Sequence, residues 1–253
     1  MRLTKYLEFK ESDLDPSKSF KLKDELNPKV WENFKINESI SDKLVEIAED
    51  FYYSTELEAD IVDIALVGSL CNYNWSENYS DYDLHIIIDY SDINDDLILV
   101  EKVCDLSKKL WNDCHDIKIE GYDVEVAIQD KKALDGSIDG GRMGGVYSLL
   151  NDKWIKKPEK IDFEPDEDLI KEKSKSIMIQ IDEIVDESED MEYSKLKEKI
   201  KRIWSKVKRI RESSLEEEGE FGIGNLVFKM LRRNGYIEKI IDIKRDKYDK
   251  QFK

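Results

Sequence analysis

Two aspartates separated by one residue, Asp81 and Asp83, open an apolar run that continues to Ile88. In an extended strand alternate side chains share a face, so the two carboxylates lie together while Tyr82 and Leu84 point the other way. Carboxylates held this close repel each other unless a cation lies between them. Because Mg²⁺ prefers hard oxygen ligands, the pair is a candidate Mg²⁺ site.

A Gly-Ser pair precedes this strand. Gly68 and Ser69 end an earlier apolar run, and a loop of eleven residues separates them from Asp81. Glycine allows a phosphate to approach the backbone, and backbone N–H groups and the serine hydroxyl can donate hydrogen bonds to its oxygens. The turn is therefore a candidate phosphate-binding site beside the candidate metal site.

A later stretch, residues 122–128, alternates apolar and polar side chains and predicts another strand. Its polar face carries Asp123 and Glu125. Transfer of a phosphorus-containing group with two metal ions about 3.5–4 Å apart needs a further ligand. Either of these acids can supply a third carboxylate.

The segment from Gly68-Ser69 to Asp81-Tyr82-Asp83-Leu84 resembles the signature of the polymerase β-type nucleotidyltransferase superfamily, over roughly residues 61–128. The resemblance implies an α+β fold in which helices flank a small mixed β-sheet. Glu125, between two valines, fits the family's apolar-acid-apolar pattern better than the alternate, Asp123. The whole chain is also similar to uncharacterised nucleotidyltransferase-like proteins of tailed bacteriophages.

This resemblance implies an enzyme that transfers a nucleoside monophosphate from an NTP, such as ATP, to a hydroxyl group and releases pyrophosphate. The hydroxyl could belong to RNA, protein or a small molecule. Asp81, Asp83 and Glu125 would hold Mg²⁺ or Mn²⁺, and Gly68 and Ser69 would hold the NTP phosphates. The alternative is a catalytically silent module of the same fold that binds a nucleotide or a macromolecular partner.

The surrounding pattern predicts the elements that position these residues. The predicted strands and helices are a helix over roughly 40–56, strands at 61–67 and 84–88, a helix over 92–111, an extended stretch at 117–128 bent at Gly121, a hairpin over 146–155, helices at about 166–187 and 192–217, and two shorter helices on either side of Gly235. In the helix over 92–111 the residues expected to face inward are Leu97, Val100, Val103, Cys104, Leu110 and Trp111. Residues 131–145 contain five glycines and are expected to form a mobile loop.

The remaining polar and aromatic side chains near the motif allow two interpretations each. His85 shares the face of the aspartates and either reaches the acceptor or is a hydrogen-bonded strand residue. Aromatic residues in the loop before Asp81 either stack on a base or pack against the sheet edge; they are Tyr73, Trp75 and Tyr79. Arg142 and Lys153 are candidates for further phosphate contacts.

Charge is divided unevenly along the chain. The 253 residues carry a net charge of −17, but residues 191–253 contain 18 Lys and Arg against 11 Asp and Glu. The basic run at 195–211 is either a solvated amphipathic helix or a surface for RNA or nucleotide phosphate. A general attraction of the whole protein to long nucleic acid is disfavoured.

Composition also predicts the broader organisation. We expect a loosely ordered arm at 1–27, a catalytic domain at 28–160 and a helical domain at 161–253. Because no apolar run approaches the ~20 residues of a membrane span, no membrane association is expected. Three cysteines without CxxC spacing favour reduced thiols. Together these features predict a cytoplasmic protein.

Overall fold

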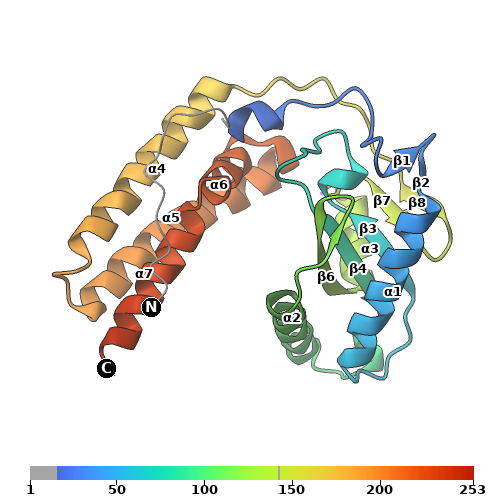
Figure 1. The fold of residues 1–253 in the computed structure, drawn as a ribbon, viewed down its shortest axis with the longest axis horizontal. Helices are drawn as coiled ribbons and strands as arrows, with labels where there is room; N and C mark the ends of the chain where they lie inside the picture. Colours follow the sequence, from blue (N-terminus) through green and yellow to red (C-terminus); the bar gives the residue numbers. More distant parts are fainter. Residues whose placement is uncertain (1–15, 142) are drawn as a thin grey trace. The chain divides into compact units, whose positions relative to one another are not determined.

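The computed structural model describes residues 16–141 and 143–253 of the chain (Figure 1). The described chain divides into two compact units. The sheet unit comprises residues 21–164 and 213–222, and the helical unit comprises residues 16–20, 165–212 and 223–253. Residues 1–15 of the predicted N-terminal arm lie outside the described residues.

A six-stranded mixed sheet forms the centre of the sheet unit, which confirms the predicted α+β class. The strands are β3 (Asp63–Val67), β4 (Tyr82–Ile88), β5 (Lys118–Ile119), β6 (Tyr122–Asp130), β7 (Val146–Ser148) and β8 (Lys153–Lys156), in the order β5-β6-β4-β3-β7-β8. β4 and β6 pair in parallel and the other neighbours are antiparallel. A separate two-stranded sheet joins β1 (Trp31–Glu32) to β2 (Lys35–Ile36).

Hairpins lie at the predicted bend at Gly121, which separates two strands rather than bending one, and at the predicted Asn-Asp turn. β5 and β6 are joined through Glu120 and Gly121, whose φ angles of 50° and 88° lie in the left-handed region. β7 and β8 are joined through the predicted Asn-Asp turn, where Asp152 has a φ of 46°. The Tyr147 hydroxyl donates a hydrogen bond of 2.5 Å to the Asp152 carboxylate across this hairpin. Local turn chemistry therefore forms the two hairpins that add the edge strands β5 and β8 to the sheet.

The two faces of the sheet have different partners. One face packs in the main core with α1 (Glu38–Ser54) and α2 (Leu97–Cys114), through side chains such as Leu66, Leu84 and Ile86. The opposite face carries a smaller cluster in which Ile87 packs with Leu134 of α3 (Lys131–Asp139). Figure 1 shows α1 running alongside the strands. Odd-numbered positions of β4, and with them the aspartates, lie on the face of the smaller cluster.

The predicted inward face of α2 is wrong in part. Val100 and Cys104 are buried, whereas Leu97, Val103 and Leu110 are exposed. Because α2 packs mainly on β6, only one narrow arc of its surface meets the sheet, and the other apolar side chains lie beside that arc. The helix also begins later than predicted, since the Asp96 side chain accepts a hydrogen bond from the Leu99 backbone N–H.

The expected loop over 131–145 is also wrong in part, because residues 131–139 form α3. The Asp130 side chain caps this helix by accepting from the Ala133 N–H, and Leu134 is buried against the sheet. A buried apolar anchor and an N-cap outweigh the helix-breaking tendency of Gly136. The glycines from Gly140 onward follow the helix and lie outside it.

The helical unit contains the four helices expected from the sequence. They are α4 (Glu167–Glu187), α5 (Tyr193–Glu217, of which residues from Ser213 belong to the sheet unit), α6 (Ile223–Arg233) and α7 (Tyr236–Lys250), with the short 3₁₀ helix η1 (Pro16–Phe20). Gly235 separates α6 from α7 with a φ of 73°, which favours glycine. Among the described residues, none of the helices combines the length and the apolar character that crossing a membrane requires.

Candidate metal and nucleotide site

Three carboxylates converge where β4 begins. Asp83 on β4 is paired in register with Glu125 on the parallel strand β6, and Asp81 lies two residues before Asp83 on the same face. One oxygen from each of these three residues lies within 4.8 Å of the others. Asp81 and Asp83 are half-buried and Glu125 is exposed. Three oxygens at this separation form a donor set suited to a hard divalent cation.

Gly68 lies directly against this cluster at the end of β3. Val67 pairs with Asp83 in the antiparallel register, which brings the following glycine beside the carboxylate. Gly68 has φ 78° and ψ −161°, a conformation that is essentially restricted to glycine. A Cβ atom at this position would lie 1.8 Å from Asp83 Oδ2. The absence of a side chain at Gly68 therefore makes room for the Asp83 carboxylate.

Ser69 begins the short 3₁₀ helix η2 (Ser69–Cys71), and its hydroxyl is 2.7 Å from the Ser80 hydroxyl. The Ser80 oxygen also accepts a 2.8 Å hydrogen bond from the Ser76 N–H. Since Ser80 immediately precedes Asp81, the serine pair joins the two ends of the eleven-residue loop. This contact fixes the Gly-Ser turn relative to the aspartate strand. No local sequence pattern distinguishes Ser80 from other loop serines.

Asp123, the alternate third acid, lies outside the carboxylate cluster. It is paired with Lys118 across the β5–β6 hairpin, and its side chain is 59% exposed. Glu125 is the acid that shares a register position with Asp83. The structure therefore brings Glu125, and not Asp123, into the group with the two β4 aspartates.

His85 faces the same side of the sheet, one register step further along β4. Its Nδ1 is 2.7 Å from Gln129 Oε1 on β6. Burial lowers the pKa of His85, the charge of Lys108 lowers it further, and the Gln129 contact opposes the shift. The residue is thus held as a hydrogen-bonded strand histidine beneath the carboxylates, which favours the second of its two sequence interpretations.

The loop after the Gly-Ser turn is held by a residue from far along the chain. Glu220, in the short helix η4 (Gly219–Phe221), accepts hydrogen bonds from Asn72 Nδ2 at 2.7 Å and from Asn74 Nδ2 at 3.0 Å. A Cβ at Gly144 would lie 2.3 Å from Asn72 Nδ2. The glycine-rich segment therefore packs tightly against the same loop. Sequence reasoning missed Glu220 because its partners lie some 146–148 residues away.

The loop aromatics are largely engaged by the protein itself. Tyr73 is buried, and Trp75 packs against the main core. The Trp75 indole donates to the Glu25 carbonyl at 2.9 Å, and the Lys23 ammonium lies 5.2 Å from its ring centroid. These contacts favour packing against the sheet edge over stacking on a base for both residues.

The predicted basic residues are not gathered at the site. Lys153 is exposed on the edge strand β8, three strands from β4 in the sheet order, or about 14 Å across the sheet. Arg142 lies outside the described residues. Neither position therefore identifies a basic side chain for the NTP phosphates.

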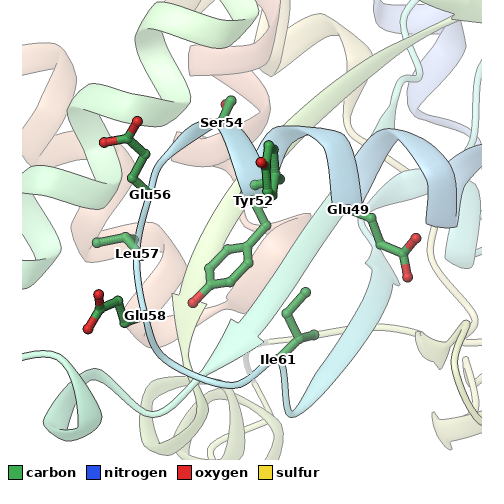
Figure 2. A pocket seen from close by; sticks show the side chains of 8 residues that line it. Glu49, Tyr52, Ser54, Glu56, Leu57, Glu58 and Ile61 are labelled. Atoms are coloured by element: carbon green, nitrogen blue, oxygen red, sulfur yellow. The ribbon is translucent and has the colours of Figure 1, made fainter.

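A surface cavity of about 650 Å³ lies elsewhere (Figure 2). It is lined by the end of α1 and the segment that leads into β3, including Glu49, Tyr52 and Ile61. Ile61 precedes β3 and Gly68 follows it, so the cavity and the carboxylate cluster lie at opposite ends of this strand. The Tyr52 hydroxyl donates to the Ala59 carbonyl at 2.5 Å, which gives the cavity wall a structural role.

We compared the chain with protein-family models, with curated proteins and with solved structures, and none of them matches it.

Proposed function

We propose that this protein is a Mg²⁺-dependent nucleotidyltransferase with a polymerase β-type fold. The observation that carries the proposal is the convergence of Asp81, Asp83 and Glu125 beside Gly68. Gly68 follows β3, the two aspartates lie at the start of β4, and Glu125 lies on β6, which pairs in parallel with β4. This is the order of the resemblance, in which a Gly-Ser turn precedes the aspartate strand and a later strand supplies the third carboxylate. A surface cluster of acids would not need a glycine-only backbone conformation against one of its carboxylates.

The donor set fits divalent metal chemistry. When bound, Mg²⁺ would neutralise charge on the triphosphate and lower the pKa of the acceptor hydroxyl. Asp81, Asp83 and Glu125 would hold the metal through carboxylate oxygens. Backbone N–H groups at Gly68 and Ser69 would orient the β and γ phosphates of the NTP. The Ser69–Ser80 contact keeps this turn in place before substrate binds.

The reaction that follows from these roles is attack of an acceptor hydroxyl on the α-phosphorus of an NTP. A bond forms between the acceptor oxygen and phosphorus, the bond to the bridging oxygen breaks, and pyrophosphate leaves with that electron pair. The acceptor hydroxyl loses its proton. RNA, protein and small-molecule hydroxyls all fit this scheme.

The test measures pyrophosphate release with each of the four NTPs, Mg²⁺ or Mn²⁺, and total cellular RNA or protein as acceptor. We expect Asp81→Asn, Asp83→Asn and Glu125→Gln each to lower turnover by roughly 10²-fold or more, because each removes charge from a preorganised site. Asp123→Asn is the matched control, since it removes a carboxylate from the same face of β6 outside the cluster. Circular dichroism checks that every variant folds.

Two outcomes would contradict the proposal. Turnover that survives all three cluster substitutions would show that these acids are not catalytic. NTP binding by titration calorimetry, without pyrophosphate release from the NTP in the presence of any acceptor, would instead support the catalytically silent module, which uses the same turn to hold a nucleotide.

A further inference from the structure

The helical unit carries a concentrated positive charge on α5. Between residues 195 and 211 there are nine Lys or Arg residues and one acid, Glu198. The apolar face of this helix is buried, through Leu196, Ile200, Ile203 and Val207. Because the buried arc occupies one side, helical periodicity divides the bases between two flanks of the exposed surface.

One flank is engaged with α4. Lys199 forms an ion pair with Glu187, and the Lys206 ammonium donates a 3.1 Å hydrogen bond to Gln180 Oε1. Both partners belong to α4. These bases therefore help to pack the helices of the unit against each other.

The other flank, which we call the Trp204 flank, is open. Its members recur at helical spacing and are Lys197, Lys201, Trp204, Lys208 and Arg211. Within the described chain, Lys197 and Lys201 form no ion pair, and Lys208 pairs only with the neighbouring Glu212 at 3.3 Å. Trp204 is 36% exposed, so part of its indole reaches the surface among these bases.

Two guanidinium groups extend this flank without a bound carboxylate. The Arg211 guanidinium lies 4.2 Å from the Phe228 ring centroid on α6. Burial lowers the pKa of Arg211, and the charge of Arg232 lowers it further. Neither arginine forms an ion pair in the described part of the chain. Two positive charges that repel each other favour a nearby anion over a further cation.

We propose that the Trp204 flank, with Arg232, binds single-stranded nucleic acid. From Lys197 to Arg211 the helix rises about 21 Å, so several successive phosphates of an extended strand can meet its bases. An exposed indole within a basic stripe offers a stacking platform for a base, and an acidic polypeptide would make no comparable use of it. This inference does not depend on the proposed nucleotidyl transfer.

Salt dependence is the first test. The intact protein is titrated against fluorescein-labelled oligo(U) RNA and oligo(dT) DNA of about 16 nucleotides by fluorescence anisotropy, without NTP or divalent metal. If about four phosphates are neutralised, log K falls against log salt with a slope of about −2.8, which is about 50-fold between 50 and 200 mM KCl. Equal binding of both probes identifies the shared backbone, and a preference for RNA identifies contacts to the 2′-hydroxyl.

Substitutions then locate the surface. Lys197→Gln with Lys201→Gln should reduce the magnitude of the slope by about 1.4. Trp204→Ala should weaken binding about 5-fold or more, whereas Trp204→Phe should retain most of it, because either aromatic ring can stack on a base. The matched control is Lys244→Gln with Lys250→Gln, which removes the same charge from exposed positions on α7.

Three results would overturn the inference. The first is the absence of binding to either probe at 50 mM salt. The second is an equal loss in the α7 control, which would indicate only general charge attraction. The third is binding of polyglutamate as tightly as the oligonucleotides, with no loss of oligonucleotide binding in Trp204→Ala, which would assign the flank to an acidic protein.

Discussion

Substitution of Gly68 by alanine gives the sharpest test of the candidate site. The new Cβ would lie 1.8 Å from Asp83 Oδ2, whereas real Cβ contacts are essentially never closer than 3.0 Å. The carboxylate must therefore retreat by about 1.2 Å or the turn must move. A displacement of about 1 Å at a reacting centre can lower turnover roughly 10²-fold. We expect Gly68→Ala to weaken Mn²⁺ binding and turnover by a factor of that order.

Stability should fall as well, because φ 78° with ψ −161° is a conformation that alanine adopts only under strain. Strain of this kind costs about 1–3 kcal/mol, or roughly 2–10 °C in Tm for a protein of this size. Mn²⁺ binding is measured by electron paramagnetic resonance without NTP, and stability by thermal unfolding. Gly121→Ala is the matched control, since Gly121 also has a positive φ of 88° but would place its Cβ in open space.

The two variants separate strain from crowding. Gly121→Ala should lose stability and keep full Mn²⁺ affinity, whereas Gly68→Ala should lose both. Wild-type Mn²⁺ affinity and turnover in Gly68→Ala would refute the reasoning, because Asp83 would then have no need of the space beside the turn.

Three further predictions concern the surroundings of the site and the helical unit. Glu220→Gln should lower the free energy of urea unfolding by about 1–2 kcal/mol and speed hydrogen exchange in the 70–80 loop. The reason is that an amide cannot accept from both asparagines as the carboxylate does. As the control, Glu216→Gln, at an exposed position on α5, should change neither the unfolding free energy nor the exchange rate. NMR titration should place the pKa of His85 below 6.5. The part of the unfolding free energy that comes from neutral His85 should be complete above pH 6.5 and be lost as the pH falls below it. Burial and Asp182 raise the pKa of Tyr236 to about 12. The contribution of Tyr236 to stability should therefore be complete below pH 10 and lost as the pH rises toward 12. Asp182→Asn should make that loss smaller when unfolding is followed by tyrosine absorbance.

Strand periodicity was sufficient to predict which carboxylates share a face. Side chains alternate between the two sheet faces along β4 and β6, which determines the face on which each acid lies. Parallel pairing then brings Asp83 level with Glu125. The choice of Glu125 over Asp123 came from the family pattern. The structure places Asp123 opposite Lys118 on the neighbouring strand β5, a pairing that the sequence alone did not reveal.

Sequence reasoning failed where tertiary partners decide the outcome. Val103 and Leu110 are apolar and helical, but which arc of α2 is covered depends on the position of β6. The five glycines at 131–145 predicted a loop where the structure has α3. This helix is stabilised by the Asp130 cap and the burial of Leu134. Glu220 could not be found because its role depends on an approach between distant segments.

The return of residues 213–222 to the sheet unit makes the two units inseparable by any single cut. The described chain passes from one unit to the other near residues 20, 164, 212 and 222. A truncation at the end of the sheet strands would discard Glu220 and leave Asn72 and Asn74 without that acceptor. A single proteolytic nick between residues 21 and 221 would leave both fragments with parts of each unit. The helical unit likewise cannot be exchanged as one continuous segment, because its residues come from three separate stretches of the chain.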